Sequence, residues 1–233
     1  MSEEKIMRIR DIEALVYKKN IKNFHLNVLP PDGNVRVSVP RDVSDDTIRL
    51  FIVQKYHWIK KHVKSFQEQE RQTKREYVSG ESHYFKGKRY TLRVEQAKRP
   101  KIETRNKRYI YFYVPEHYTI QQRQNYYEKW LRKELKKELE ILVPKWEKII
   151  GVKVNEVRIK KMKTKWGSCN PDAKRIWINL ELIKKPREYL EYIIVHELVH
   201  LLERNHTRRF KEIMDKYLPR WRIHKRQLNE FIL

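Results

Sequence analysis

The feature that most constrains this chain is the run VHELVHLLERNH from Val195 to His206. Residues four apart on an α-helix share one face, so the spacing of His196 and His200 lets two imidazoles point at one metal ion. Glu197 lies about 100° further round the helix axis, where its carboxylate can reach a water molecule beside that ion. The run therefore predicts a helix with two metal ligands and a general base.

A third histidine, His206, follows ten residues after the first. A continuous helix would place it about 9 Å along and nearly 240° round from His200, so the helix must end between them. We expect that end at Asn205, because Asn tolerates the left-handed conformation. Three imidazoles with an open fourth position are typical of a catalytic zinc site, which predicts one Zn²⁺ per chain. The alternative is a buried helix whose histidines are satisfied by hydrogen bonds, although chance would give this pattern only about 0.001 times in such a chain.

The segment HELVHLLERNHTRRF, with KWGSC at Lys165 to Cys169 upstream, resembles the YgjP-like metallopeptidases, relatives of the SprT-like and WLM zinc proteases among the zincins. The resemblance implies a zincin-like core, in which a small sheet packs on the HExxH helix, and the activity of a zinc metalloendopeptidase. The resemblance implies that His196, His200 and His206 are the zinc ligands and that Glu197 is the general base. Asn205 and Phe210 match the positions that flank the third ligand in the family. The ligand spacing is also that of metzincins, which have Gly where this chain has Glu203.

The resemblance also implies that the strand beside the active-site helix binds substrate by adding a strand to the sheet edge. The residues expected to bind substrate in this way are Trp166, Gly167, Ser168 and Cys169. Cys169 has two further interpretations, a zinc ligand in a latent state or a small packing residue. For an oxyanion stabiliser the candidates are Tyr217 and His224, each of which has an alternative as a core tyrosine or a surface histidine.

The charge balance is strongly basic, with Lys+Arg 54 against Asp+Glu 30 and a formal net charge of +24. Such an excess is typical of proteins that associate with nucleic acid or another polyanion. Codon bias or solvated charged faces are the alternatives. There is no apolar run of about 18 residues, no signal peptide is recognisable, and there is one Cys. We therefore expect a cytoplasmic protein without a membrane partner.

The pattern along the chain predicts an α+β protein without an internal repeat. Before Pro115 we expect a hairpin around the PPDGN turn, one long helix capped by Ser44 with apolar residues as far as Phe66, and strands from His83 to Val114. Basic residues alternate with Tyr and Phe in those strands. This alternation suits contact with phosphates and bases, and it equally suits an ordinary half-buried strand.

A composition shift after Pro115 predicts two domains, a basic β-rich region with one long helix over 1–117 and a zincin-like core over 118–233. In the second we expect a helix kinked or split by Pro144, then paired strands, the HExxH helix, and two terminal helices. The paired strands are expected over Val152 to Met162 and Arg175 to Leu182. Thr207 is the expected cap of the first terminal helix, and the last helix is expected over Arg222 to Leu233.

Two classes of function remain from the sequence. The first is a zinc peptidase that hydrolyses polypeptides, including proteins associated with nucleic acid. The second is a nucleic-acid-binding protein with a structural or latent zinc site, which a fourth protein ligand on the metal would favour.

Overall fold

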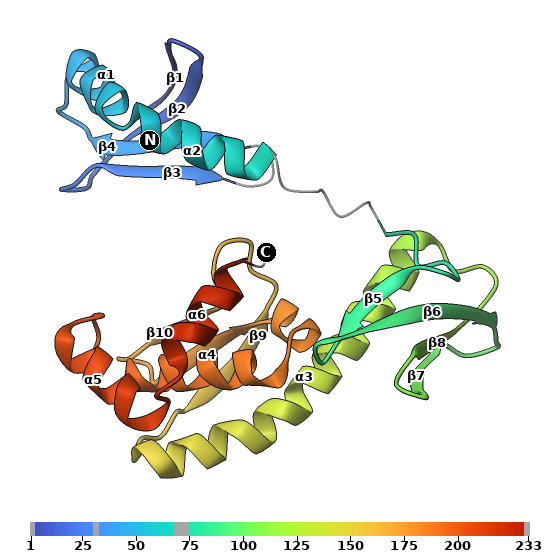
Figure 1. Ribbon diagram of the computed structural model, residues 1–233. Helices are drawn as coiled ribbons and strands as arrows, with labels where there is room; N and C mark the ends of the chain where they lie inside the picture. Colours follow the sequence, from blue (N-terminus) through green and yellow to red (C-terminus); the bar gives the residue numbers. More distant parts are fainter. Residues whose placement is uncertain (1–2, 30–32, 68–74, 231–233) are drawn as a thin grey trace. The chain divides into compact units, whose positions relative to one another are not determined.

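The computed structural model describes residues 3–29, 33–67 and 75–230. Its contacts divide the chain into two compact units, Met1–Thr73 and Lys74–Leu233, each of which is considered by itself (Figure 1). This division differs from the expected boundary after residue 117, which lies inside the second unit. The described residues include no helix long and apolar enough to cross a membrane.

The first unit is a four-stranded sheet covered by two helices. The strands, in the spatial order β1-β2-β4-β3, are β1 (Glu3–Ile9), β2 (Ile12–Lys19), β4 (Asn34–Pro40) and β3 (His25–Leu29). The two central strands are parallel, and both outer pairs are antiparallel. The expected hairpin is present as β3 and β4, although turn residues 30–32 lie outside the described residues.

The single long helix expected after Ser44 is two helices, α1 (Asp45–Gln54) and α2 (Tyr56–Gln67), separated at Lys55. The Ser44 cap is confirmed, since its hydroxyl accepts a hydrogen bond from the Thr47 amide. Ile48, Ile52 and Ile59 are fully buried against the sheet, while the side chain of Phe66 lies outside the described residues. The break at Lys55 does not disturb the apolar face that these three isoleucines share.

The second unit begins with another four-stranded sheet. Its strands, in the spatial order β5-β6-β8-β7, are β5 (Ser82–Phe85), β6 (Lys88–Gln96), β8 (Tyr109–Val114) and β7 (Lys101–Arg105). Again the central pair is parallel and the outer pairs are antiparallel. The sheet therefore repeats the topology of the first unit, although the sequence shows no internal repeat. These four strands confirm the expectation of strands from His83 to Val114.

Helix α3 (Ile120–Ile150) links this sheet to the rest of the unit. It begins with a capping box between Thr119 and Gln122 and ends at Gly151, whose left-handed φ of 80° suits glycine. Pro144 lies inside the helix and does not split it, contrary to one of the two expectations. The side chains at the start of α3 pack on the sheet, with ring centroids of Phe85 and Trp130 4.7 Å apart.

A second, three-stranded sheet and the remaining helices complete the unit. These elements are β9 (Glu156–Lys160), β10 (Gly167–Asn170), β11 (Arg175–Asn179), the 3₁₀ helix η1 (Leu180–Lys184), α4 (Arg187–Val199), α5 (Arg208–Tyr217) and α6 (Trp221–Glu230). The order is β10-β11-β9, with β11 parallel to β9 and antiparallel to β10. The two expected strands do pair, but they are shorter than expected, and β10 covers most of the segment that the resemblance implied as the substrate-binding strand. The predicted α+β class is confirmed.

The turn between β5 and β6 joins the two parts of the second unit. The amides of Lys86 and Gly87 donate to the carbonyls of Ile183 and Lys184, at 2.8 and 3.2 Å. A Cβ on Gly87, which has a φ of 77°, would lie 2.8 Å from the Cα of Pro186. This close docking, together with α3, explains why residues 75–117 belong with the zincin-like half and not with the first unit.

Candidate metal centre

Helix α4 ends earlier than expected. Its last residue is Val199, and His200 is the C-cap with αR dihedrals. Asn205 is not among the described residues with positive φ, so the left-handed turn expected there is wrong. Instead, the amides of Leu202 and Glu203 donate to the carbonyl of Val199 and close the helix with tight turns. The chain then bends back, and Thr207 caps α5 as expected.

This bend brings the three predicted histidines together. A possible ligand nitrogen from each of His196, His200 and His206 lies within 4.8 Å of the other two. The Nε2 atoms of His196 and His206 are 3.0 Å apart. Sequence spacing predicted this cluster, and the early helix end is what lets His206 join it.

The local environment holds the imidazoles in place. Nδ1 of His200 faces the carbonyl oxygen of Glu203 at 3.2 Å, so a proton on Nδ1 leaves Nε2 with a free lone pair. The ring of Phe210, which is fully buried, lies 4.8 to 5.0 Å from all three imidazole rings. Phe210 is therefore the apolar residue that packs against all three imidazoles. The sequence indicated Phe210 only as a match to a flanking position of the family motif.

The donor set fits a zinc ion. Two nitrogens on a tetrahedral zinc are roughly 3.3 Å apart, given Zn–N bonds of about 2.0 to 2.1 Å, and the observed Nε2 separation of 3.0 Å is close to this. Burial lowers the pKa of His196 to about 3, and it also lowers the pKa of His200 and His206. Neutral imidazoles are the form that binds a metal. Within the described residues the cluster offers three possible ligand nitrogens, which leaves room for a fourth ligand from solvent or substrate.

Glu197 lies beside the cluster and is almost fully buried, with 4% of its surface exposed. Burial raises the pKa of its carboxyl group to about 8, and the charge of Lys165 opposes this rise. A carboxyl group with a pKa near neutrality is suited to accept and return a proton. A dication bound at the histidines would favour its ionised form.

Strand β10 lies against α4 at the edge of its sheet. A Cβ on Gly167 would lie 2.6 Å from Oε1 of Glu197 and 2.8 Å from Cγ2 of Ile193. A larger residue at this position would therefore require the side chains of Glu197 and Ile193 to move. Cys169 is on the same side of the strand as Gly167, because side chains alternate, and Ser168 is on the other side, opposite Trp177.

The pairing of β10 with β11 determines which main-chain groups reach the free edge. The amide of Asn179 donates to the carbonyl of Trp166 at 2.9 Å, which makes these two a hydrogen-bonded pair. Narrow and wide pairs alternate in an antiparallel ladder, so Gly167 and Cys169 direct their N–H and C=O groups away from β11. The edge next to Glu197 thus offers main-chain donors and acceptors to an extended chain.

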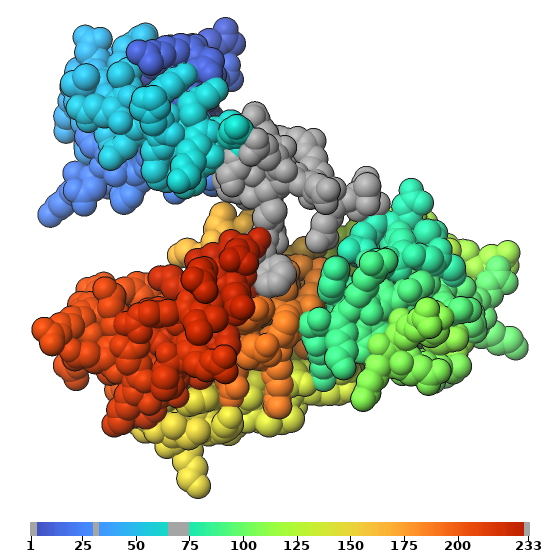
Figure 2. Space-filling model, in the orientation of Figure 1, coloured from blue at the N-terminus to red at the C-terminus, as the bar shows by residue number. Residues whose placement is uncertain are grey.

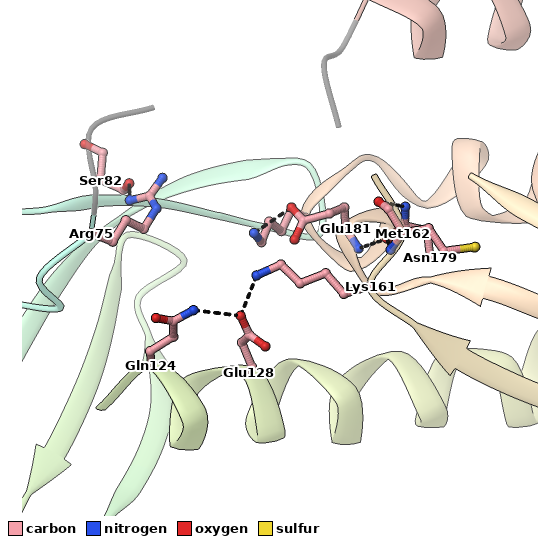
Figure 3. Close-up of polar contacts among 9 residues, drawn as sticks. Arg75, Ser82, Gln124, Glu128, Lys161, Met162, Asn179 and Glu181 are labelled. Carbon is pink, nitrogen blue, oxygen red and sulfur yellow. Dashed lines mark hydrogen bonds and ion pairs between the residues drawn. The ribbon is translucent and has the colours of Figure 1, made fainter. Parts of the chain in front are cut away.

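Asn179 fixes the loop that leads into β10. This fully buried side chain donates to the carbonyl of Met162 at 2.9 Å and accepts from the Glu181 amide (Figure 3). It also donates to the carbonyl of Lys165 at 2.8 Å. In the same view Glu128 of α3 accepts from Lys161. Asn179 was not predicted from the sequence, where its signal is its position at the end of an alternating strand just before a helical turn.

The remaining predicted residues lie near this edge or further away. Trp166 is partly buried against the core, and Nζ of Lys185 lies 6.0 Å from its ring. Tyr217 also packs against the core. His224 lies 5.9 Å from Tyr189, centroid to centroid, and its buried Nδ1 has no partner among the described residues. The contacts of the described residues join neither Tyr217 nor His224 to the three histidines.

The comparisons with known proteins place the chain beside metallopeptidases. The family model described as YgjP-like, metallopeptidase domain, matches residues 22–231. One similar solved structure is the metallopeptidase zymogen of Pyrococcus abyssi abylysin, with 23% identity, TM-score 0.37, and coverage of 39% of this chain and 90% of that one. Another is the zymogen of Methanocaldococcus jannaschii jannalysin, with 22% identity, TM-score 0.36, and coverage of 40% and 94%. No curated protein matches the chain.

Proposed function

Because this chain belongs to the YgjP-like metallopeptidase family, as its motif predicted, we propose that it hydrolyses peptide bonds with one zinc ion held by His196, His200 and His206. The observation that carries this proposal is the convergence of three imidazoles beside a buried carboxyl group. When bound, zinc supplies a Lewis acid that polarises the scissile carbonyl and activates water at neutral pH.

The protein's own groups have separate tasks in this proposal. Glu197 takes a proton from the attacking water and delivers it to the leaving amine. Gly167 and Cys169 pair through their main-chain groups with an extended substrate, while Trp166 and Ser168 flank this edge. Pairing through the main chain reads little side-chain information, so the enzyme should cleave polypeptides of varied sequence.

One detail of the site supports an open catalytic centre over a closed one. Within the described residues Cys169 does not belong to the group of ligand atoms that lie within 4.8 Å of one another, which consists of the three histidines. The oxyanion stabiliser stays a prediction, with Tyr217 and His224 as its candidates; the unpaired Nδ1 of His224 on α6, a helix that packs on α4, favours the latter.

We also propose that the substrates include proteins associated with nucleic acid, since the net charge of +24 favours polyanions. Cys169 is a free thiol, which fits a reducing compartment such as the cytoplasm. The second candidate function is a nucleic-acid-binding protein with a structural or latent zinc site. The same charge favours it, but the three-histidine set does not resemble the thiolate-rich structural zinc sites.

The experiment that tests the proposal pairs metal analysis with degradation of an unstructured protein, with and without DNA. Wild type is compared with Glu197→Gln and with Glu188→Gln, a control that changes an exposed residue on the same helix. We expect one zinc per chain in all three proteins and cleavage by wild type and the control alone. General acid–base groups contribute about 10² to 10⁴ in rate, so Glu197→Gln should lose at least 100-fold.

Other outcomes discriminate among the alternatives. Stoichiometric zinc without cleavage under any condition would favour the binding protein or a latent enzyme. Purified protein that neither contains nor takes up zinc would overturn the metal centre. Equal cleavage by Glu197→Gln would remove the assigned base while leaving the metal site intact.

A further inference from the structure

Three tyrosines form a row on one face of the second unit's first sheet. Tyr109, Tyr111 and Tyr113 occupy alternate positions of β8, a central strand, and successive ring centroids are 6.3 and 6.4 Å apart. The residues between them, Ile110, Phe112 and Val114, are at most 1% exposed and face the core. The tyrosines therefore point to the opposite face, and each is only partly buried.

Cationic side chains contact every ring of this row. The guanidinium carbon of Arg93 lies 4.4 Å from the ring centroid of Tyr109, and that of Arg105 lies 4.5 Å from the centroid of Tyr111. Lys101 and Arg108 approach the rings of Tyr113 and Tyr109 at 6.0 and 5.6 Å. We call this surface the tyrosine row: Tyr109, Tyr111 and Tyr113 with Arg93, Lys101, Arg105 and Arg108.

Two carboxylates lie on the same face as the row. Glu103 lies opposite Tyr111 and pairs with Lys101 at 2.5 Å and with Arg105, and Glu95 on β6 lies opposite Tyr113. Two carboxylates among four cations leave the row positively charged. These ion pairs are exposed, so they are weak and can be exchanged for phosphate contacts at little cost.

The first unit shows that the fold does not require such a surface. Its sheet has the same strand order and pairing, yet its outer face on β4 carries Asn34, Arg36 and Ser38 in place of the tyrosines. A single tyrosine, Tyr17, stands on the neighbouring strand, and its hydroxyl donates to Glu4. The inner faces of both sheets are apolar, as a core demands. The row is therefore an addition to the topology and not a consequence of it.

The chemistry of the row selects its partner. Unpaired bases stack on aromatic rings regardless of sequence, and nearby Arg and Lys side chains bind the phosphates between them. A duplex keeps its bases stacked inside and could use only the charges. We infer that the tyrosine row binds single-stranded nucleic acid, with bases stacked on Tyr109, Tyr111 and Tyr113 and phosphates on Arg93, Lys101, Arg105 and Arg108.

This surface is separate from the metal centre. In the second unit the sheet β5–β8 lies at the start of α3, whereas α5 and α6 lie toward its other end (Figures 1 and 2). The inference goes beyond the proposed function and does not depend on it, because binding can be measured whether or not the chain cleaves peptides. If both hold, the row would tether the peptidase near proteins on single strands.

The test measures binding of the full chain to a fluorescein-labelled single strand of mixed sequence, and to its duplex, by fluorescence anisotropy over a series of salt concentrations. Tyr111→Ala is compared with Tyr17→Ala, which removes the tyrosine on the outer face of the first unit's sheet. The pair Arg93→Gln/Arg105→Gln is compared with Lys19→Gln/Arg36→Gln, whose cations lie about as close to Tyr17. Tyr111→Phe retains the aromatic ring and is the conservative control.

Stacking is worth about 1 to 3 kcal/mol per base, so Tyr111→Ala should weaken single-strand binding roughly 5- to 150-fold without changing the salt dependence. The arginine pair should reduce the slope of log K against log salt by roughly 1.4, about 0.7 for each phosphate that the variant no longer neutralises. Tyr111→Phe and the first-unit variants should bind nearly as wild type. Zinc content and thermal unfolding should be unchanged in all of them.

Three results would overturn the inference. Duplex that binds as tightly as the single strand would show that only charge is read. Equal reductions in affinity from the Arg93/Arg105 and Lys19/Arg36 pairs would show that binding is spread over the whole surface. Full binding by Tyr111→Ala would exclude stacking, and if that variant failed to fold, the arginine pair and its counterpart would decide the question.

Discussion

The two four-stranded sheets share one topology and differ in the helix that follows them. In the first unit α1 and α2 pack on the sheet, and the hydrophobic core of this unit lies between the sheet and the two helices. In the second, α3 covers the sheet with its first turns and then continues to the three-stranded sheet and α4, so one core runs through the unit. The same arrangement of strands thus forms a self-contained unit in the first case. In the second case it shares one core with the elements that carry the metal centre.

The length of the helix explains this difference. The first sheet is followed by helices of 10 and 12 residues separated at Lys55, whereas α3 has 31 residues without a break. Contacts of α3 with η1 and α4 connect the sheet to the helix that carries His196 and Glu197. Damage to the second sheet should therefore reach the metal centre, and damage to the first should not.

The largest effect that tests this comparison is the loss of a central core residue from each sheet. Phe112 on β8 is fully buried and lies 5.9 Å from Tyr126 and 6.1 Å from Tyr127 of α3, centroid to centroid. Phe112→Ala should lower the free energy of unfolding of the second unit by about 3 to 5 kcal/mol. Val37→Ala on β4 should cost the first unit about 2 kcal/mol, because it removes two methyl groups.

Calorimetry and zinc content measure the two variants. We expect zinc binding to become heat-sensitive in Phe112→Ala and to stay as in wild type in Val37→Ala. If Val37→Ala also weakened zinc binding, the two units would be coupled and the comparison would fail.

The next largest effect is on zinc affinity, and it compares one histidine from each unit. His206→Ala removes one of three ligands, and since the loss of an outer-shell partner alone costs 10- to 100-fold, zinc affinity should fall by more than about 100-fold. His25→Ala, on an exposed position of β3, should leave it unchanged. Competition with a chelator gives both affinities. Equal affinities in the two variants would exclude His206 as a ligand.

The metal centre could be predicted from sequence because its information is local. His196 and His200 are four residues apart on one helix, and the position of His206 required only that the helix end. Even so, the way it ends was mispredicted, since tight turns after Val199 replace the expected turn at Asn205. Either ending brings His206 back to the cluster, which is why the error did not affect the ligand set.

The sheets could not be predicted as well, because strand pairing is decided by residues far apart in sequence. The two sheets share a topology, but their sequences do not resemble each other. For example, β4 has Arg36 at an outward-facing position, whereas β8 has Tyr111 at such a position. The boundary after residue 117 was misplaced because composition does not report the hydrogen bonds of Lys86 and Gly87 to η1. Docking of this kind depends on geometry that only the folded chain has.

A smaller effect distinguishes the strand at the metal centre from the two repeated sheets. Gly167→Ala would force a Cβ to within 2.6 Å of Oε1 of Glu197, so the carboxylate must move. Displacement of a reacting group by about 1 Å can cost 100-fold in rate, and we expect a loss of roughly 10- to 100-fold in kcat. Ser168→Ala, on the other side of β10, should keep kcat. Zinc content should match wild type in both, and an unchanged kcat in Gly167→Ala would show that the carboxylate has room to adjust.

The smallest effect compares the helix caps of the two units. Ser44 caps α1 through its bond from the Thr47 amide, and Thr119 caps α3 through its bond from the Gln122 amide. Replacing either with Ala should cost about 1 kcal/mol. The same free energy shifts the melting temperature by about 4 to 8 °C in a domain of 60–100 residues and by about 2 to 4 °C in one of 150–250 residues, because the entropy of unfolding grows with size. Ser44→Ala should therefore lower one transition by about twice as much as Thr119→Ala lowers the other, and a shift of the same transition by both variants would show that the two cores unfold together.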